Sequence, residues 1–180
     1  MNEKITIDED GYLMLQGSWT DEEAATYFGK TSEKIKKLHI VADGFEHYAW
    51  LRTLTDLKSL VIERQNFDTS ILPHGLTTLD ARRNTITSLS TLSNICPELR
   101  ALYIGWCRNP PNDLNWVLAF TNLDILCLSG LNIYTIEEIS KLQALPLTEL
   151  FLMDNGFSWP EEENKIIEMF PACELFFKEH

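Results

Sequence analysis

The sequence contains no long apolar run and few of the features that mark secreted proteins. No stretch approaches the ~18 consecutive apolar residues of a membrane-spanning helix. Residues 1–10 lack the apolar segment of a signal peptide, and no Asn-x-Ser/Thr sequon occurs. Neither CxxC spacing nor a paired framework relates the four cysteines, which are Cys96, Cys107, Cys127 and Cys173. These absences predict free thiols, a reducing compartment and a cytoplasmic location, with no membrane as partner.

Basic residues are scarce, because 15 Lys and Arg stand against 27 Asp and Glu, and the net charge is −12. The excess of acid lies at both ends, with a net charge of −5 in residues 1–34, zero in residues 35–136 and −7 in residues 137–180. Non-specific nucleic-acid binding needs a positive footprint, so nucleic acid is excluded as a partner. The acidic balance favours a neutral or basic protein partner. An acidic surface that only keeps the protein soluble is the open alternative.

Patterns of catalytic and metal-binding residues are also missing. A zinc site needs three or four converging ligands, and no HExxH or HxH spacing relates the histidines, which are His39, His47, His74 and His180. Cys127 has no base near it in the sequence that could activate a thiol nucleophile. The sequence therefore predicts no catalytic residue, no metal site and no cofactor, and we expect a protein that is not an enzyme.

The sequence does contain one six-residue pattern, apolar-x-x-Leu-x-apolar, that recurs six times. Successive units begin 22, 19, 23, 24 and 24 residues apart, and they are Ile35–Ile40, Leu57–Ile62, Leu76–Ala81, Leu99–Ile104, Leu123–Leu128 and Leu147–Leu152. A weaker seventh unit, Ala172–Phe177, begins 25 residues after the sixth. Repetition at this period indicates stacked supersecondary units instead of a single closed core.

These units resemble those of the leucine-rich repeat family over roughly residues 35–178. One unit alone is weak support, whereas six units at nearly constant spacing are strong support. The resemblance implies an α/β fold, a leucine-rich repeat solenoid in the form of a short curved horseshoe. Parallel strands are expected on its concave face, and helices or turns on its convex face.

Repeats of this family often carry Asn at the ninth position, where the side chain bonds the backbone of the turn. The residues found there are Asn84 and Asn155, which match, Cys107, an accepted variant, Asp43 and Gln65, which could serve the same role, and Leu131, which could not. The resemblance thus implies turns that are regular in some repeats and irregular in others.

Residues 1–34 precede the repeats and predict an N-terminal cap. Ile5–Ile7 and Tyr12–Leu15 flank an acidic turn, which indicates a hairpin. Thr20 and Glu23 then have the spacing of a capping box at the start of a short helix. The predicted organisation is a cap over residues 1–34, leucine-rich repeats over residues 35–171, and a closing strand with a tail over residues 172–180.

The segments between the strand patterns are expected to be helical or irregular. The candidate helices are Glu46–Leu54, Ser88–Ile95, Asp113–Phe120, Ile136–Leu145 and Pro160–Met169. The 19-residue repeat leaves room only for a tight turn around Asp68–Pro73.

Large apolar side chains are predicted on the concave face of the later repeats. If positions 1, 4 and 6 of the pattern fill the core, then positions 3, 5, 7 and 8 face outward. In the later repeats these positions carry Tyr103, Trp106, Ile125, Cys127, Phe151, Met153 and Phe176. Exposed apolar groups of this kind mark interaction sites, and Tyr and Trp often anchor binding. A cap or loop folded over these groups is the open alternative.

Charged residues accompany this apolar group. The acids beside it favour a partner with a basic rim, and they are Glu149, Asp154, Glu174 and Glu179. A secondary basic patch is predicted on the earlier repeats, formed by Arg64, Arg82, Arg83 and Arg100, with Arg108 nearby. An ion-pair ladder with Glu63 and Asp80 is the favoured interpretation of these arginines, and a site for an acidic peptide is the alternative.

These features predict a non-enzymatic protein–protein interaction module that binds a protein partner on its concave face. Leucine-rich repeat proteins mostly act in this way, so the resemblance and the face agree. Size and charge suggest an immunity or inhibitor protein that neutralises a basic toxin or enzyme. The alternatives are an adaptor or scaffold subunit of a larger complex, a bacterial effector acting in a host cell, and self-association through the apolar face.

Overall fold

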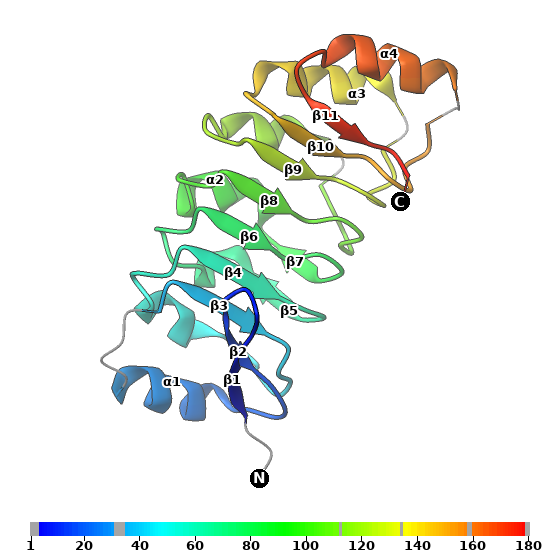
Figure 1. Cartoon of the computed structure of the whole chain (residues 1–180). Coiled ribbons are helices and arrows are strands. Elements are labelled where there is room, and N and C mark those ends of the chain that lie inside the picture. Colours follow the sequence, from blue (N-terminus) through cyan, green and yellow to red (C-terminus); the bar gives the residue numbers. More distant parts are fainter. Residues whose placement is uncertain (1–3, 31–34, 112, 134, 158–159, 179–180) are drawn as a thin grey trace.

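The computed structural model describes residues 4–30, 35–111, 113–133, 135–157 and 160–178. Nine strands of the described residues form one sheet, in which all neighbours are parallel except the first pair (Figure 1). In their order across the sheet they are β1 (Ile5–Ile7), β2 (Leu13–Leu15), β3 (Lys37–Ile40), β4 (Ser59–Ile62), β6 (Thr78–Asp80), β8 (Ala101–Tyr103), β9 (Ile125–Cys127), β10 (Glu149–Phe151) and β11 (Glu174–Phe176).

The strand pattern predicted from the leucines is confirmed residue by residue. The leucines at position 4 pair across the sheet in one continuous row, which is Leu38, Leu60, Leu79, Leu102, Leu126, Leu150 and Leu175. All except Leu175 are at most 1% exposed. Burial of one leucine side chain contributes about 1.5–3 kcal/mol, so this row and the parallel row at position 6 hold successive repeats together.

The parallel part of the sheet begins one strand earlier than the repeat pattern indicates. Strand β2 pairs in parallel with β3, and Leu13 and Leu15 lie opposite the core positions Leu38 and Ile40. Helix α1 (Asp21–Lys30) then returns along the convex side as in a repeat. This unit escapes the pattern because position 1, three residues before Leu13, is the polar Asp10.

The expected capping box is present at the start of α1. The backbone N–H of Glu23 donates to Thr20 Oγ1 at 3.1 Å, and the backbone N–H of Thr20 donates to Glu23 Oε2 at 2.9 Å. Two free N–H groups at the start of the helix, those of Thr20 and Glu23, are therefore satisfied by side chains. At the buried side of the helix, Phe28 stacks on Trp50 with ring centroids 4.9 Å apart, which covers the N-terminal end of the core.

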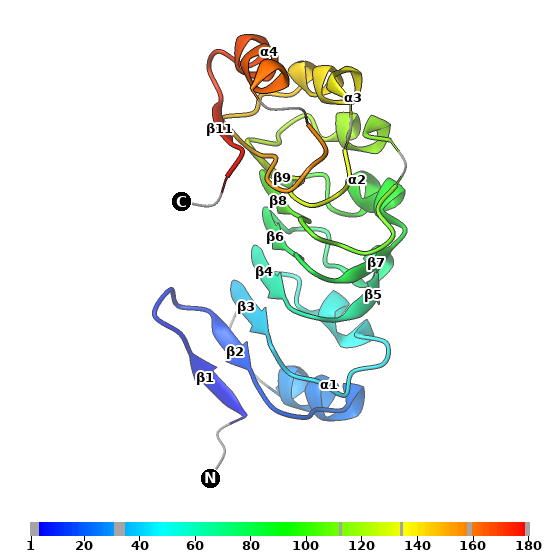
Figure 2. The same cartoon turned by 90° about the vertical axis from the view of Figure 1, so that its right-hand side faces the viewer.

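The convex side carries short helical segments, where the sequence predicted five helices and, around Asp68–Pro73, a tight turn (Figure 2). They are η1 (Ala49–Thr53), η2 (Thr69–Ile71), η3 (Leu89–Thr91), α2 (Leu92–Ile95), η4 (Asn115–Ala119), α3 (Ile136–Ser140), η5 (Lys141–Ala144) and α4 (Glu161–Met169). The predicted helices at 88–95, 136–145 and 160–169 are helical over nearly their whole range, whereas those at 46–54 and 113–120 shorten to the 3₁₀ turns η1 and η4.

Hydrogen bonds from Asp21 of the N-terminal cap explain why the first predicted helix begins at Ala49 and not at Glu46. The Asp21 carboxylate accepts the backbone N–H groups of Glu46, His47 and Tyr48 at 2.7–3.0 Å. Tyr48 has a left-handed backbone with a φ of 53°, so the helix cannot begin before Ala49. Residue 88 has a φ of 62° and delays η3 in the same way.

The ninth position of the repeats acts as the resemblance implied. Asn84 is 1% exposed, and its Nδ2 donates to the Ile62 carbonyl at 2.7 Å. Asn155 Oδ1 accepts from the backbone N–H groups of Leu131 and Ile133 at 3.2 and 3.1 Å. Asn155 thus satisfies the preceding turn, where the apolar side chain of Leu131 cannot form a hydrogen bond. Cys107 Sγ and Gln65 Nε2 also donate to turn carbonyls, but Asp43 accepts from the Ser18 hydroxyl instead.

A second small sheet was not expected. Strands β5 (Asn66–Asp68) and β7 (Thr85–Thr87) pair in parallel just after the turns of their repeats. In the part of the chain that the structure describes, no helix is both long and apolar enough to span a membrane.

Candidate functional site

The open sheet face is built from position 5 of each repeat, because positions 4 and 6 on either side point into the core. Strand pairing aligns these residues across the sheet, from Met14 on β2 through His39, Val61, Asp80, Tyr103, Cys127 and Phe151 to Phe176 on β11. The first half of this row is mixed and polar, and the second half is mainly aromatic. The predicted difference between the two halves is therefore present in the structure.

Three rings form the aromatic ladder, defined here as Tyr103, Phe151 and Phe176. Phe151 stacks on Phe176 with centroids 4.2 Å apart and planes 7° from parallel. Tyr103 and Phe151 lie 6.2 Å apart at 52°. All three side chains are only partly buried, although each carries a large apolar surface. Burial together with the negative charges of Glu149 and Asp80 raises the pKa of Tyr103, so its phenol stays neutral and can donate a hydrogen bond.

Cys127 was predicted among the exposed apolar residues of the sheet face, but it is buried. It occupies the expected place on β9, between Tyr103 and Phe151, but its side chain is only 2% exposed. Strands lie about 4.8 Å apart, so large rings on both neighbours close over a small side chain between them. Cys127 therefore supports the aromatic ladder from below and offers no surface of its own.

Trp106 and Asp154 are bound to each other. The indole Nε1 of Trp106 donates to Asp154 Oδ2 at 3.1 Å across the intervening repeat, whose residue there is Gly130. A Cβ on Gly130 would lie 2.3 Å from the Trp106 ring, so only glycine lets the indole cross this repeat. Asp154 thus positions Trp106 and is not a free acid at the edge of the site.

The remaining predicted residues surround the ladder. Ile125, Met153 and Glu149 are partly buried, and Glu174 is exposed. Glu149 and Glu174 lie directly opposite each other on β10 and β11, at position 3 beside the two phenylalanines. Glu179 lies outside the described residues.

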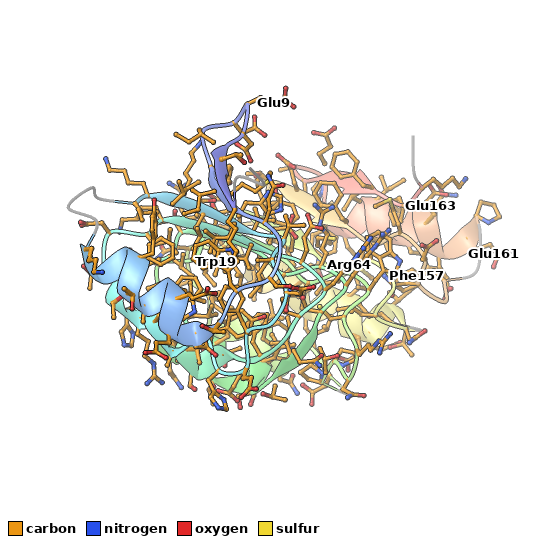
Figure 3. All side chains as sticks on the ribbon, turned by 90° about the horizontal axis from the view of Figure 1, so that it is seen from below. Glu9, Trp19, Arg64, Phe157, Glu161 and Glu163 are labelled. Carbon is orange, nitrogen blue, oxygen red and sulfur yellow. The ribbon has the colours of Figure 1, made fainter. Side chains whose placement is uncertain are left out.

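The N-terminal hairpin contacts part of the other half of the face. The Tyr12 hydroxyl lies 2.6 Å from Ser59 Oγ on β4, and Lys37 Nζ on β3 donates to the Asp10 carbonyl at 2.9 Å. The tip of the hairpin, marked by Glu9 in Figure 3, stands away from the body, whereas Trp19 lies inside it. Among the described residues, the recorded bonds from the hairpin loop to the face end at β4. The cap therefore contacts β3 and β4 in the polar half and not the aromatic ladder.

The predicted arginines do not act as one ladder. Arg82 makes a two-pronged ion pair with Asp80, with Nη2 2.6 Å from Oδ2, and Arg100 pairs with Asp124. Glu63 bonds His39 Nε2 at 2.9 Å and no arginine. Arg83 lies over the Trp106 ring at 5.5 Å, and Arg64 has no carboxylate partner among the described residues. The predicted pairing with Asp80 therefore holds for Arg82 alone, Arg100 pairs with Asp124 instead, and Arg64, Arg83 and Arg108 make no ion pair among the described residues.

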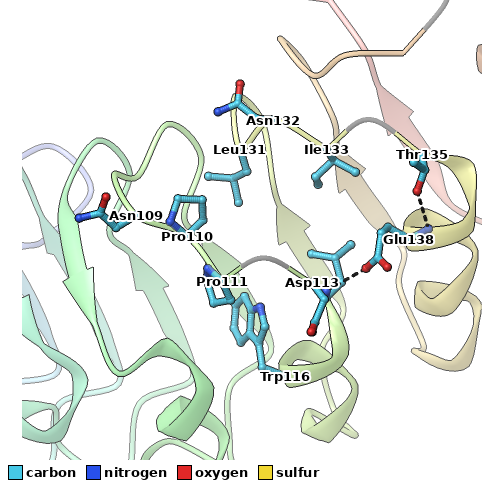
Figure 4. A pocket seen from close by; sticks show the side chains of 11 residues that line it. Asn109, Pro110, Pro111, Asp113, Trp116, Leu131, Asn132, Ile133, Thr135 and Glu138 are labelled. Atoms are coloured by element: carbon cyan, nitrogen blue, oxygen red, sulfur yellow. Dashed lines mark hydrogen bonds between the residues drawn. The ribbon is translucent and has the colours of Figure 1, made fainter.

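Two hollows open on the described surface, one beside the arginines and one between two repeats. The arginine hollow, of about 390 Å³, opens on the sheet face and is lined by His39, Val61, Glu63, Arg64, Asp80, Arg82, Arg83 and Trp106. A second hollow of about 580 Å³ lies between the returning segments of two repeats, with Pro110, Pro111, Leu131, Ile133 and Trp116 in its wall (Figure 4). None of the predicted site residues lines the second hollow.

The thiols of Cys96 and Cys107 are buried. Burial raises the pKa of Cys96 to about 12 and that of Cys107 to about 11, so both thiols stay protonated at neutral pH. No group of three or more His, Cys, Asp or Glu residues among those described could hold a metal ion. The features available for chemistry are thus an aromatic surface, two facing carboxylates and two arginines.

No protein-family model and no curated protein matches the sequence. Solved structures do match the fold. An internalin (inlF) from Listeria monocytogenes is 22% identical with a TM-score of 0.56, over 81% of this chain and 48% of that one. A leucine-rich repeat protein of Leptospira interrogans is 22% identical with a TM-score of 0.52, over 79% of this chain and 44% of that one. The chain spans less than half the length of either protein, and it has the leucine-rich repeat fold.

Proposed function

We propose that this protein is a non-enzymatic interaction module that binds a protein partner through the C-terminal half of its open sheet face. The aromatic ladder carries the proposal, because three large rings keep part of their surface exposed side by side on β8, β10 and β11. Aromatic side chains supply much of the energy of protein interfaces, and exposed apolar patches of this kind mark such sites.

Two carboxylates define the chemistry of one part of the partner. Glu149 and Glu174 face each other on neighbouring strands, and neither makes a recorded ion pair within the described chain. Like charges in directly opposite positions repel and destabilise a sheet. A basic side chain of the partner would relieve that repulsion, and the net charge of −12 would speed its approach.

The finer proposal is a neutralising role in the cytoplasm. An acidic module that covers a basic toxin or enzyme would inhibit it by occlusion, so that binding itself is the activity, as for an immunity or inhibitor protein. An adaptor or scaffold subunit would use the same surface without inhibiting its partner. A bacterial effector would use it inside a host cell.

Affinity capture from lysate of the source organism tests this proposal. Tagged wild-type protein is compared with Phe151→Glu, which places a charge within the aromatic ladder. The matched control is Ile167→Glu, since Ile167 is 47% exposed on α4, away from the sheet face. We expect one stoichiometric protein to be retained by the wild type and the control, and lost by Phe151→Glu.

The activity of the captured protein then separates the roles. Loss of that activity at equimolar amounts supports the neutraliser, and unchanged activity supports the adaptor. A partner that Phe151→Glu captures as well as the wild type does would contradict the proposed surface.

A further inference from the structure

The arginine hollow concentrates positive charge in an acidic chain. Arg82 is paired with Asp80, and Glu63, which bonds His39 Nε2, keeps its negative charge when His39 is neutral, so three arginines stand against two carboxylates in the hollow. Arg64 and Arg83 remain without a carboxylate partner among the described residues. Both side chains are exposed, and a guanidinium stays protonated at all physiological pH values and can only donate, so both are available to bind an anionic acceptor.

The two arginines start from equivalent points. Both occupy position 8 of their repeats, just after the adjacent strands β4 and β6, with left-handed φ values of 56° and 62°. Adjacent strands lie about 4.8 Å apart, which suits two guanidinium groups that share one anion. The Arg83 guanidinium lies over the Trp106 ring at 5.5 Å, and this cation–π contact restrains the side chain beside the hollow that both residues line.

We infer that Arg64 and Arg83 form a carboxylate-binding subsite for an acidic side chain of the protein partner. The inference rests on the proposed function, because the hollow and the aromatic ladder form one surface. Arg82 lies over the Tyr103 ring at 5.6 Å and joins the two.

With this subsite, the two ends of the binding surface carry opposite charges. Positive charge lies at Arg64 and Arg83, the aromatic ladder follows, and Glu149 and Glu174 lie toward the far edge of the sheet. A partner segment therefore carries an acidic side chain at one end, apolar anchors in the middle and a basic side chain at the other end. Such complementarity fixes orientation and excludes the reversed arrangement.

Selection from a random linear peptide display library tests the subsite. The library is selected against the wild-type protein, the double variant Arg64→Gln, Arg83→Gln, and Phe151→Glu. Arg108→Gln is the matched control, because Arg108 is an exposed arginine outside the hollow. Thermal unfolding of each variant first establishes that it is folded.

We expect the wild type and the control to enrich peptides in which Asp or Glu accompanies aromatic residues. The double variant should retain the aromatic preference and lose the acidic one. In a selected peptide, replacing the acid with Gln should weaken binding to the wild type about tenfold, as expected for hydrogen bonds to a charged group, and leave binding to the double variant unchanged.

A failure of the subsite can be distinguished from a failure of the proposed function. Peptides that depend on Phe151 but show no acidic preference, or retain it on the double variant, overturn the subsite and leave the proposed function intact. Peptides indifferent to Phe151 contradict the proposed function, and a library without any ligand for the wild type contradicts both.

Discussion

The two halves of the sheet face share one scaffold but differ in what covers them. On β3 and β4 the chain supplies its own cover, because Tyr12 and Asp10 of the hairpin loop bond Ser59 and Lys37. On β8 to β11 the aromatic ladder keeps part of its surface exposed. The same strand register thus presents one half that the hairpin contacts at β3 and β4, beside the arginine hollow, and one half that the hairpin leaves uncovered.

The difference does not extend into the core. Leu60 under the covered half and Leu126 under the open half are both 0% exposed, and both lie in one row of paired leucines. In a solenoid each repeat contacts only its neighbours, so surface residues can change without altering the layer beneath them. The comparison therefore teaches that stability is shared along the chain, whereas binding chemistry is local.

Core substitutions should give the largest effect, and the same effect in both halves. Leu60→Ala and Leu126→Ala should each lower the free energy of unfolding by about 2–5 kcal/mol, since each leaves a cavity in a closed layer. Urea denaturation measures both. A large cost in one half and none in the other would mean that the halves do not share a continuous core.

Substitution on the open face should separate binding from stability. Phe151→Glu should weaken partner binding by about 2 kcal/mol or more, as for a central aromatic anchor, while folding stays largely intact. Met14→Glu is the matched control, because Met14 occupies the same strand position in the covered half. Calorimetric titration with the captured partner and thermal unfolding measure the two effects. If Phe151→Glu unfolds the protein, Phe151 belongs to the core.

Loss of the hairpin tether should have a smaller effect, limited to the covered half. Tyr12→Phe removes the hydroxyl that pairs with Ser59 Oγ. Because Ser59 is only 8% exposed, this loss should lower the free energy of unfolding by about 1 kcal/mol. Hydrogen exchange in the hairpin should speed up, while exchange in β8 to β11 should not change. Faster exchange along the whole sheet would show that the hairpin supports the solenoid as well as covering it.

Acid should produce the smallest effect, on the convex side. Hydrogen bonds from the side chains of Ser70 and Ser88, joined by the Ser70 backbone N–H and the Thr87 hydroxyl, hold the pKa of Asp68 far below its usual range. A lowered folded-state pKa contributes stability that is full above the unfolded value, near 3.8, and is lost as pH falls below it. Asp68→Asn should therefore reduce the acid sensitivity of unfolding, measured by thermal melts from neutral pH to pH near 2. An identical pH profile in this variant would contradict the assignment.

The sequence predicts what repeats and misses what depends on neighbours. Three features follow from local spacing, and the structure contains all of them: the leucine rows, the turns at Asn84 and Asn155, and the capping box of Thr20 and Glu23. Strand β2 was not recognised as a repeat strand because Asp10 replaces the first apolar residue of its pattern.

Contacts across repeats set the rest of the site. Burial of Cys127 depends on the size of Tyr103 and Phe151 on the flanking strands. The bond from Trp106 to Asp154 spans 48 residues and requires glycine at position 130 between them. Gly130 at position 8 was the available signal, because it interrupts a row of side chains that otherwise face outward.

Site-specific photocrosslinking tests the central claim most directly. A benzophenone amino acid in place of Tyr103 substitutes one aromatic group for another on the open half, and the same group in place of Ile167 reports on the convex side. On irradiation in lysate of the source organism, we predict a covalent complex with one partner from position 103 and none from position 167. A complex formed only from position 167 would contradict binding through the open sheet face.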